Sequence, residues 1–315
     1  MISTRLAKLA IQARETEPVF SMDSVGTLQE VFNREEFVHG SGADKQRIML
    51  ASAQCKYRSE TEYPWDSYFG FGLAPLLAGK KALDLGCFTG GRTIAWLERY
   101  KLLHITGIDV KEVFIEAANE FAASRQSSAD FLVARAERLP FVEDCFDAVM
   151  SFDVFEHVQD VRMTLSECHR VLKPGGMLFV VFPGYFHPME HHLSLATRTP
   201  CLHWVFSGQT LVTAYDEVLA ERGGRADWYR RESPILEGWE RGNHVNGTTV
   251  ASFQKMIAGT DWRVVSEPKK PVGAIGRNAS RSVKARAVSR YLTPLVLVPG
   301  VREFVLHRIT YVLLK

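Results

Sequence analysis

The ten residues from Ala82 to Gly91 constrain the fold of this chain more than any other stretch. Their sequence, Ala-Leu-Asp-Leu-Gly-Cys-Phe-Thr-Gly-Gly, joins an apolar strand to a glycine-rich turn. Gly86 and Gly90 allow the backbone to turn sharply, and Thr89 is a candidate N-cap for a helix that begins near Gly91. A strand, a tight turn and a helix in this order are typical of an open parallel sheet that binds a nucleotide-like ligand.

Two acidic residues are predicted at the carboxyl ends of neighbouring strands, where open parallel sheets bind their ligands. Asp84 belongs to the first strand, and its carboxylate suits a ligand with an ammonium group. Asp109 follows a second strand over 103–108, twenty-three residues after Gly86. A carboxylate there can accept hydrogen bonds from both ribose hydroxyls of a nucleoside. A dinucleotide pyrophosphate is disfavoured beside Asp84, because both groups are negatively charged.

Regular alternation of strands and helices is predicted from residue 81 to residue 182. A helix after the second strand follows from apolar residues at helical spacing: Phe114, Ala117, Ala118, Phe121 and Ala122. Three more strands are predicted, over 129–133, 146–152 and 177–182. A helix over 161–172 should end at Lys173-Pro-Gly-Gly176. These elements together predict an α/β domain with a parallel sheet.

The ordered motifs of this region resemble class I S-adenosylmethionine (SAM)-dependent methyltransferases, in particular the family that includes the ubiquinone and menaquinone biosynthesis enzymes. Asp84-Leu-Gly-Cys-Phe-Thr-Gly90 is similar to the first motif of the class, and departs from it at Phe88, where a glycine usually stands. Later motifs follow in order: Ala136-Glu-Arg-Leu-Pro-Phe141, Phe146-Asp-Ala-Val149, Glu156-His-Val158 and Arg170-Val-Leu-Lys-Pro-Gly-Gly176. The resemblance covers residues 80–182.

The resemblance implies a Rossmann-like, doubly wound α/β fold with a mostly parallel seven-stranded sheet, and SAM as the cofactor. The residues that it places against SAM are Asp84, Gly86, Cys87, Gly90, Asp109, Val110, Ala136, Glu137 and Ser151. In this family an acid usually precedes Ala-Glu and contacts the adenine amino group, but Arg135 stands at that position here. Adenine recognition is therefore predicted to use the backbone of Ala136 and Glu137.

The segment after the fourth strand supplies the candidate catalytic residues, His157 and Glu156. His157 is predicted to lie at the sheet edge toward which the methyl group of SAM should project. Imidazoles titrate close to neutrality, which suits a general base. Glu156 could orient the imidazole or serve as the base itself. The alternative interpretation is that His157 only caps or packs the next helix.

Residues 183–247 interrupt the alternation and are predicted to form an acceptor-binding insertion after the fifth strand. The candidates for contact with the acceptor are Tyr185, His187, His191 and His192. His187-Pro-Met-Glu-His191 also matches the H-x-x-E-H spacing of some zinc peptidases. Pro188 fits poorly inside the helix that such a site requires, so no metal site is predicted.

Residues 1–79 are predicted to form a helical leader or lid before the core, which occupies 80–182. Helices are expected over 28–39 and 44–58. An aromatic loop over 62–70 is expected either to close over the cofactor or to pack the leader onto the domain.

Residues 248–315 are predicted to complete the sheet. A helix is expected over 249–257, and strands over 262–266 and 304–314. Between them, the basic and then apolar stretch 269–300 could bind an anionic membrane surface, or form a solvated helix and its packing face.

Composition narrows the class of protein. The 315 residues are 46% hydrophobic and 23% charged with a net charge of +2, which is ordinary for a soluble protein and does not imply a nucleic-acid partner. Five scattered cysteines without a C-x-x-C pair favour reduced thiols. With neither a signal-peptide pattern nor an 18-residue apolar run, a cytoplasmic location is expected.

The function predicted from the sequence is transfer of the SAM methyl group to a small-molecule acceptor, most simply a hydroxyl on a sugar, phenol or lipid-like compound. Two alternatives come from other classes. An NAD(P)-dependent Rossmann oxidoreductase would use the same strand, turn and helix, but would favour glycine at position 88 and no acid at position 84. A non-catalytic SAM-binding protein would be consistent with Phe88 and Arg135.

Overall fold

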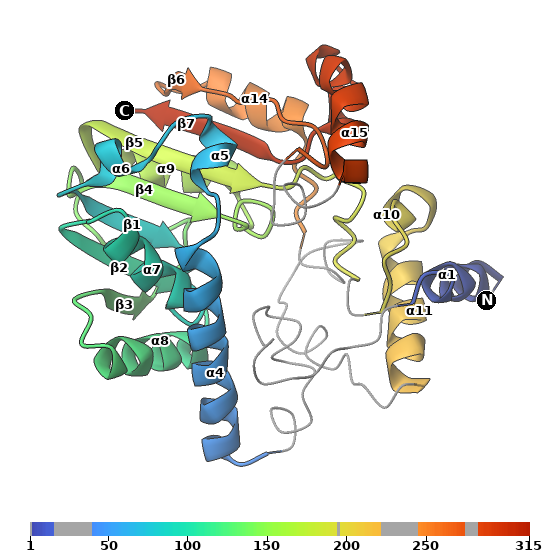
Figure 1. Ribbon diagram of the computed structural model, residues 1–315, viewed down its shortest axis with the longest axis horizontal. Coiled ribbons are helices and arrows are strands. Elements are labelled where there is room, and N and C mark those ends of the chain that lie inside the picture. Colours follow the sequence, from blue (N-terminus) through green and yellow to red (C-terminus); the bar gives the residue numbers. More distant parts are fainter. Residues whose placement is uncertain (1, 16–39, 194–195, 222–244, 275–282) are drawn as a thin grey trace.

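A seven-stranded sheet forms the centre of the molecule (Figure 1). The computed structural model describes residues 2–15, 40–193, 196–221, 245–274 and 283–315. The strands are β1 (Lys81–Leu85), β2 (His104–Asp109), β3 (Asp130–Val133), β4 (Phe146–Phe152), β5 (Leu172–Phe182), β6 (Arg263–Ser266) and β7 (Ile309–Leu314). Their order is β3-β2-β1-β4-β5-β7-β6, parallel except for β7, which is antiparallel to both neighbours. The predicted Rossmann-like, mostly parallel sheet is confirmed.

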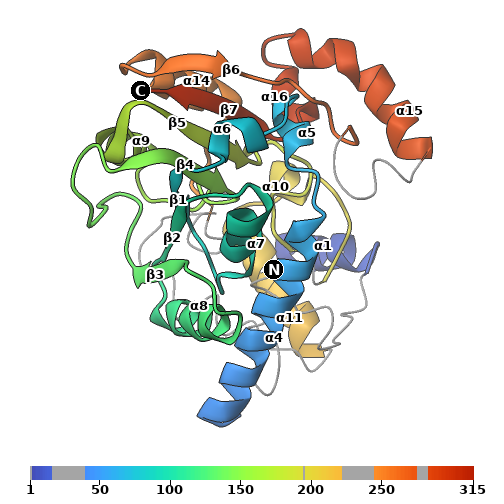
Figure 2. The same cartoon turned by 60° about the vertical axis from the view of Figure 1, so that its left-hand side comes forward.

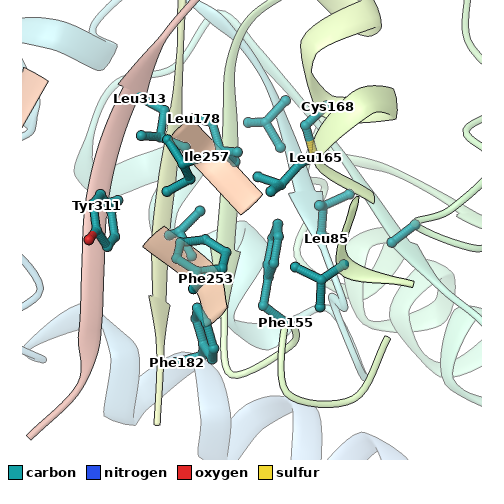
Figure 3. Close-up of a cluster of buried hydrophobic side chains, with 14 of the residues drawn as sticks. Leu85, Phe155, Leu165, Cys168, Leu178, Phe182, Phe253, Ile257, Tyr311 and Leu313 are labelled. Carbon is teal, nitrogen blue, oxygen red and sulfur yellow. The ribbon is translucent and has the colours of Figure 1, made fainter. Parts of the chain in front are cut away.

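Helices cover both faces of this sheet (Figures 1 and 2). One face packs on α4 (Gly42–Thr61), α5 (Asp66–Phe69), α6 (Ala74–Leu77), α7 (Gly91–Arg99) and α8 (Glu112–Ser124). The other packs on α9 (Val161–Val171) and α14 (Val250–Ala258). Figure 3 shows this second layer, in which Leu165 of α9 and Phe253 of α14 meet strand residues such as Leu178. Burial of apolar side chains in both layers is the main stabilising contribution.

The long helix α4 lies against the first turn of α7. A capping box between Ser41 and Asp44 closes the start of α4. A Cβ at Gly91 would lie only 2.1 Å from the carbonyl oxygen of Ala53, so only glycine permits this close approach. The predicted helix 44–58 is therefore confirmed within α4, whereas the predicted helix 28–39 lies outside the described residues.

The aromatic segment after α4 packs the leader onto the domain. Trp65 is buried with its ring centroid 4.3 Å from that of Phe152 at the end of β4, and its indole N–H donates to Glu60 (2.5 Å). Tyr68 and Phe69 of α5 are buried in the same cluster. Of the two expectations for this segment, packing is the one that these contacts support.

The first helix, α1 (Ile2–Gln12), joins the insertion instead of α4. It packs on α11 (Gly208–Glu221), and Lys8 bridges Glu221 (2.5 Å) and Glu217 (3.5 Å). The short helix α10 (Leu202–Val205) precedes α11. The two described parts of this leader, residues 2–15 and 40–79, thus pack against different parts of the molecule.

The C-terminal part contains α15 (Val283–Leu292), the 3-10 helix η2 (Thr293–Leu297) and α16 (Arg302–Val305) before β7. The predicted strand over 304–314 begins only at Ile309, because α16 occupies the preceding turn. None of the described helices is long and apolar enough to cross a membrane.

Two local expectations inside the core are wrong. Thr89 does not cap α7: Gly90 is the N-cap, in the left-handed conformation, and no side chain bonds the helix start. The fifth strand begins at Leu172 rather than at Met177. Leu172 already pairs with Phe146, and the register then shifts, so the strand starts as soon as α9 ends.

Candidate active site

The turn between β1 and α7 has the tight geometry that its glycines predict. Gly86 (φ 69°) and Gly90 (φ 75°) both adopt the left-handed conformation. A Cβ at Gly86 would lie 2.5 Å from Cγ2 of Val154, and one at Gly90 would lie 2.8 Å from Cβ of Ala118. The turn is therefore enclosed by the segment after β4 and by α8, with no space for side chains at these two positions.

Phe88 also adopts the left-handed conformation, with φ 52°. For a residue with a side chain this costs about 1–2 kcal/mol. Packing of the ring offsets this cost. The ring lies edge-on to Phe114 at a centroid distance of 4.6 Å, beside Ile48 and Met49 of α4. The backbone at this position thus keeps a glycine-like shape, and the added side chain helps to anchor the leader helix.

Asp109 lies at the end of β2, next to this turn. Its Oδ2 accepts the backbone N–H of Phe88 (3.1 Å), and its Oδ1 accepts that of Lys111 (3.2 Å). Burial raises the pKa of this carboxyl, and the amide hydrogen bonds oppose the shift. The neighbouring Val110 is exposed. The backbone therefore fixes the orientation of the predicted ribose acceptor.

Asp84 is fully buried and already has partners in α7. Thr93 donates its hydroxyl to Oδ2 (2.6 Å), and Nη2 of Arg92 lies 3.5 Å from Oδ1. Burial raises the pKa of Asp84 to about 6, against the lowering effect of Arg92. This geometry gives Asp84 a role in fixing the start of α7, and its contact with a ligand ammonium group stays a prediction.

Arg92 is a site residue that the sequence analysis missed. Its guanidinium donates to the carbonyl oxygens of Phe152 (3.0 Å) and Gly86 (3.0 Å), and lies 4.9 Å from the ring centroid of Trp96. It joins the glycine turn to the end of β4. The only sequence signal was a charged residue directly after the final glycines.

Cys87 and Ser151 lie on either side of this turn. Cys87 is buried, and burial raises the pKa of its thiol well above the usual value, so the thiol stays protonated. Ser151 is buried on β4 in register with Leu85. Its hydroxyl has no hydrogen-bond partner among the described residues, which leaves it available to a ligand.

The residues predicted at the adenine ring form a tight bend after β3. Ala136 is buried, and Oε1 of Glu137 accepts the backbone N–H of Gln159 (2.7 Å). Arg135 lies 3.6 Å from the other carboxylate oxygen of Glu137. Glu137 thus connects this bend to the segment after β4, and its role toward adenine stays a prediction.

Two acid–histidine pairs meet beyond the end of β4. His157 Nε2 lies 3.9 Å from Oε1 of Glu156, and His192 Nε2 lies 3.4 Å from Oε2 of Glu190. The two imidazole rings are 5.3 Å apart. The structure therefore brings the predicted catalytic residues, His157 and Glu156, together with His192, which was predicted to contact the acceptor, and with Glu190.

Both acids of this cluster are buried. Burial, and then repulsion between the two carboxyls, raises the pKa of Glu156 well above its ordinary value, and burial does the same for Glu190. Burial lowers the pKa of His192 to about 4. The cluster thus favours neutral side chains. Glu190 could not be identified beforehand, since the pairing of residues 156 and 190 depends on how the insertion folds back.

The other insertion candidates lie nearby but differ in their contacts. Both ring nitrogens of His191 are used by backbone groups, with Nε2 bonding the Thr199 carbonyl (3.0 Å) and Nδ1 accepting from Leu193 (3.1 Å). His187 accepts the Met189 amide (3.3 Å), and burial lowers the pKa of both histidines to about 3. Tyr185 packs against the cluster that holds α11. Acceptor contact by these residues stays a prediction.

Residues 187–191 form turns and no helix, so the zinc-peptidase arrangement of His187 and His191 is not formed. Within the described ranges, no group of three or more histidine, cysteine, aspartate or glutamate side chains is placed to hold a metal ion.

Comparison with known proteins points to one domain family. Residues 83–180 match the methyltransferase domain model. Phosphoethanolamine N-methyltransferase 1 of Triticum aestivum is 35% identical over 105 residues, which are 33% of this chain and 21% of the relative. Ubiquinone biosynthesis O-methyltransferase of Rhizobium leguminosarum bv. trifolii is 34% identical over 104 residues, which are 33% of this chain and 40% of the relative. Malonyl-[acyl-carrier protein] O-methyltransferase 1 of Coxiella burnetii is 34% identical over 114 residues, which are 36% of this chain and 37% of the relative. The aligned part thus spans less than half of each relative.

Among solved structures, an S-adenosylmethionine-dependent methyltransferase from Mesorhizobium loti aligns with 76% of this chain and 93% of its own, at 15% identity and a TM-score of 0.47. The family model covers the region that carries the glycine turn, Asp109 and the segment after β4. This core therefore belongs to the class I SAM-dependent methyltransferases.

Proposed function

We propose that the protein transfers the methyl group of SAM to a small-molecule acceptor. The observation that carries this proposal is the turn in which residues 86, 88 and 90 are all left-handed, directly beside a strand-end carboxylate held by two backbone amides. Such a turn lets a ligand approach the backbone closely, while the carboxylate of Asp109 offers acceptors to ribose hydroxyls. The match of residues 83–180 to methyltransferases supports the same assignment.

The residues around the turn fit SAM chemically. The hydroxyls of Thr89 and Ser151 and one oxygen of Asp84 are buried without hydrogen-bond partners in the described part of the chain. Buried polar groups normally have partners, so these atoms are suited to the amino and carboxylate groups of the methionine part. The two glycines at 86 and 90 let the turn pack closely against Val154 and Ala118, which holds its backbone in place.

When bound, SAM supplies a methyl group on a sulfonium, whose sulfur is already a good leaving group. The main task of this chain is then to hold the donor and the acceptor in line. Orientation of this kind can lower the barrier by about 7–11 kcal/mol. The rigid turn, fixed by Arg92 and Asp109, is suited to that task.

For a hydroxyl acceptor, we assign the proton transfer to His157. As the new bond from oxygen to the methyl carbon forms and the bond from carbon to sulfur breaks, the hydroxyl proton moves to a ring nitrogen of His157. Glu156 is less suited to be the base, because burial and repulsion by Glu190 raise its pKa and so disfavour its charged form. It instead orients the imidazole, and general-base catalysis of this kind contributes about 10²–10⁴-fold.

An amine acceptor is the second candidate, favoured by the pairing of Glu156 with Glu190. A cationic group placed between two buried carboxyls would stabilise their charged forms and so would be bound there. An N-methyltransferase and two O-methyltransferases are all among the sequence relatives. The sugar, phenol or lipid-like hydroxyl remains our first proposal, and the insertion residues Tyr185, His187 and His192 are proposed to contact it.

The test combines calorimetry with a transfer assay. Titration of the purified protein with SAM should give a saturable heat, and incubation with a library of hydroxyl and amine compounds should yield products heavier by one methylene. Binding of SAM without any transfer would favour a non-catalytic SAM-binding protein. Binding of a nicotinamide dinucleotide in place of SAM would overturn the proposal in favour of an oxidoreductase.

A further inference from the structure

A long segment near the C-terminal end of the sequence carries charge of one sign only. Between Glu267 and Glu303 there is no aspartate or glutamate, whereas eight lysine and arginine residues occur. In the described part of this segment, Lys284, Arg286 and Arg290 lie on α15 with exposed side chains. A local excess of this size contrasts with the net charge of +2 for the whole chain.

The helix that carries these charges is also rich in exposed apolar side chains. Val283 is 72% exposed and Tyr291 is 82% exposed, and Val288 is exposed as well. At 100° per residue, Val288, Tyr291 and Leu292 fall on one side of α15, and Lys284 lies among them. Arg286, Ser289 and Arg290 fall on the other side, with Val283 next to Arg290. Figure 2 shows α15 standing out from the body of the molecule. A helix packed in this way does not bury its apolar side.

The apolar surface continues beyond α15. In and after η2, Leu297 is 69% exposed and Val298 is also exposed. Phe304 of α16 then lies 5.1 Å from Trp204 of the insertion, measured between ring centroids, and Trp204 and the adjacent Val205 are exposed. The exposed apolar residues therefore extend from α15 across η2 to α10.

We propose that this face binds an anionic lipid bilayer. We define the α15–η2 surface by Val283, Lys284, Val288, Arg290, Tyr291 and Leu297. Its apolar side chains enter the boundary between headgroups and acyl chains, and its basic side chains contact lipid phosphates, because long basic side chains can extend from an apolar surface toward the interface. The inference does not depend on methyl transfer.

The combination of groups favours lipid over nucleic acid. Nucleic-acid surfaces bind mainly through charge and through stacking on aromatic rings, and exposed valine and leucine contribute little to either. A peripheral membrane helix needs both features of this surface, since neither a small apolar area nor a few charges is sufficient alone. The tyrosine and the nearby tryptophan are residue types that prefer the bilayer interface.

Vesicle flotation tests the proposal with the full chain. The wild-type protein should float with vesicles of phosphatidylcholine and phosphatidylglycerol, and not with phosphatidylcholine alone, and added salt should weaken binding. K284E/R290E should bind anionic vesicles about tenfold more weakly or worse. Y291S/L297S should also lose binding although its charge is unchanged.

Two controls separate this surface from general charge effects and from misfolding. K80E/K101E changes the charge equally at exposed lysines before β1 and β2, at the opposite edge of the sheet, and should float like the wild type. All variants should bind SAM as the wild type does. Absence of flotation, equal loss in K80E/K101E, or full binding by Y291S/L297S would overturn the proposal. Tighter binding to a duplex oligonucleotide than to anionic vesicles would assign the surface to nucleic acid.

Discussion

The ends of β2 and β4 surround a carboxyl with different hydrogen-bond partners, although burial raises the pKa of both groups. After β2, both oxygens of Asp109 accept backbone N–H groups, which stabilise its charged form. After β4, one oxygen of Glu156 has no hydrogen-bond partner in the described residues, and Glu190 disfavours its ionisation. The first arrangement is suited to constant binding of a polar ligand. The second is suited to groups that gain and lose protons, and this contrast guides the predictions that follow.

The largest effect is expected at the end of β4. His157→Gln keeps much of the side-chain size but cannot take a proton at neutral pH. With a hydroxyl acceptor, turnover should fall by about 100-fold or more, because the general base is lost. SAM affinity, measured by calorimetry, should not change. Near-normal turnover would move the proton transfer to another group or show that the acceptor needs no base.

The next effect is expected at the end of β2. Asp109→Ala removes two backbone hydrogen bonds and the proposed ribose acceptor, so SAM affinity should fall by about 1.5–3 kcal/mol. Calorimetric titration measures this directly. Asp130→Ala is the matched control, since Asp130 is an exposed acid at the start of β3 and should not affect SAM binding. If both variants bind SAM equally well, Asp109 does not contribute to SAM binding, and the proposed contrast between the two strand ends is wrong.

The dependence of stability on pH should reveal the balance between histidines and acids. The histidines with pKa values lowered to about 3 or about 4 by burial are His187, His191, His192, His203 and His307. Below about pH 6.5 the unfolded chain binds protons that these folded histidines do not, so their contribution to stability is lost as the pH falls toward 4. The raised pKa values of Asp84, Asp109, Glu156 and Glu190 act in the opposite direction.

Among the described residues, the lowered pKa values of the histidines outnumber the raised pKa values of the acids, so the net result should be a loss of stability on acidification. For each proton that the unfolded chain binds in excess of the folded chain, the free energy of unfolding falls by about 1.4 kcal/mol per unit decrease in pH. Urea unfolding at pH 7.5, 6.5, 5.5 and 4.5 would measure it. An increase in stability over this range would mean that the acids dominate the balance.

The smallest effect is expected for Glu156→Gln. This change removes a buried acid that Glu190 opposes, so the melting temperature at neutral pH should rise by about 1–2 °C, as for roughly 1 kcal/mol in a chain of this size. Turnover should fall less than in His157→Gln, since Glu156 only orients the base. A lower melting temperature would show that the contacts of Glu156 contribute more to stability than its burial costs.

The sequence was sufficient for the core because its signals there are local. Apolar runs set β1 to β4, and the glycines at 86 and 90 set the turn. Phe88 departs from the glycine usual at this position, but its backbone adopts the same left-handed conformation and its ring packs on α8 and α4. Such compensation involves residues forty positions away, which no local pattern encodes.

The β4 end of the site could be predicted only in part. His157 and Glu156 stand in a recognisable motif, whereas Glu190 and His192 reach them only because the insertion turns back over the sheet edge. Arg92 was missed for a related reason: its partners are backbone carbonyls, which are the same for every residue type. The pairing of α1 with α11 also depends on long-range packing that apolar spacing does not specify.

The position of β7 has a consequence for how the chain folds during synthesis. This strand, Ile309–Leu314, lies between β5 and β6 and pairs with both. A ribosome must therefore translate past residue 314 before the sheet can close, although β1 to β5 emerge much earlier. Until then, β5 exposes an apolar edge to which other chains can add. Nascent chains of this protein should thus depend on chaperones for longer than the position of its methyltransferase core in the sequence would suggest.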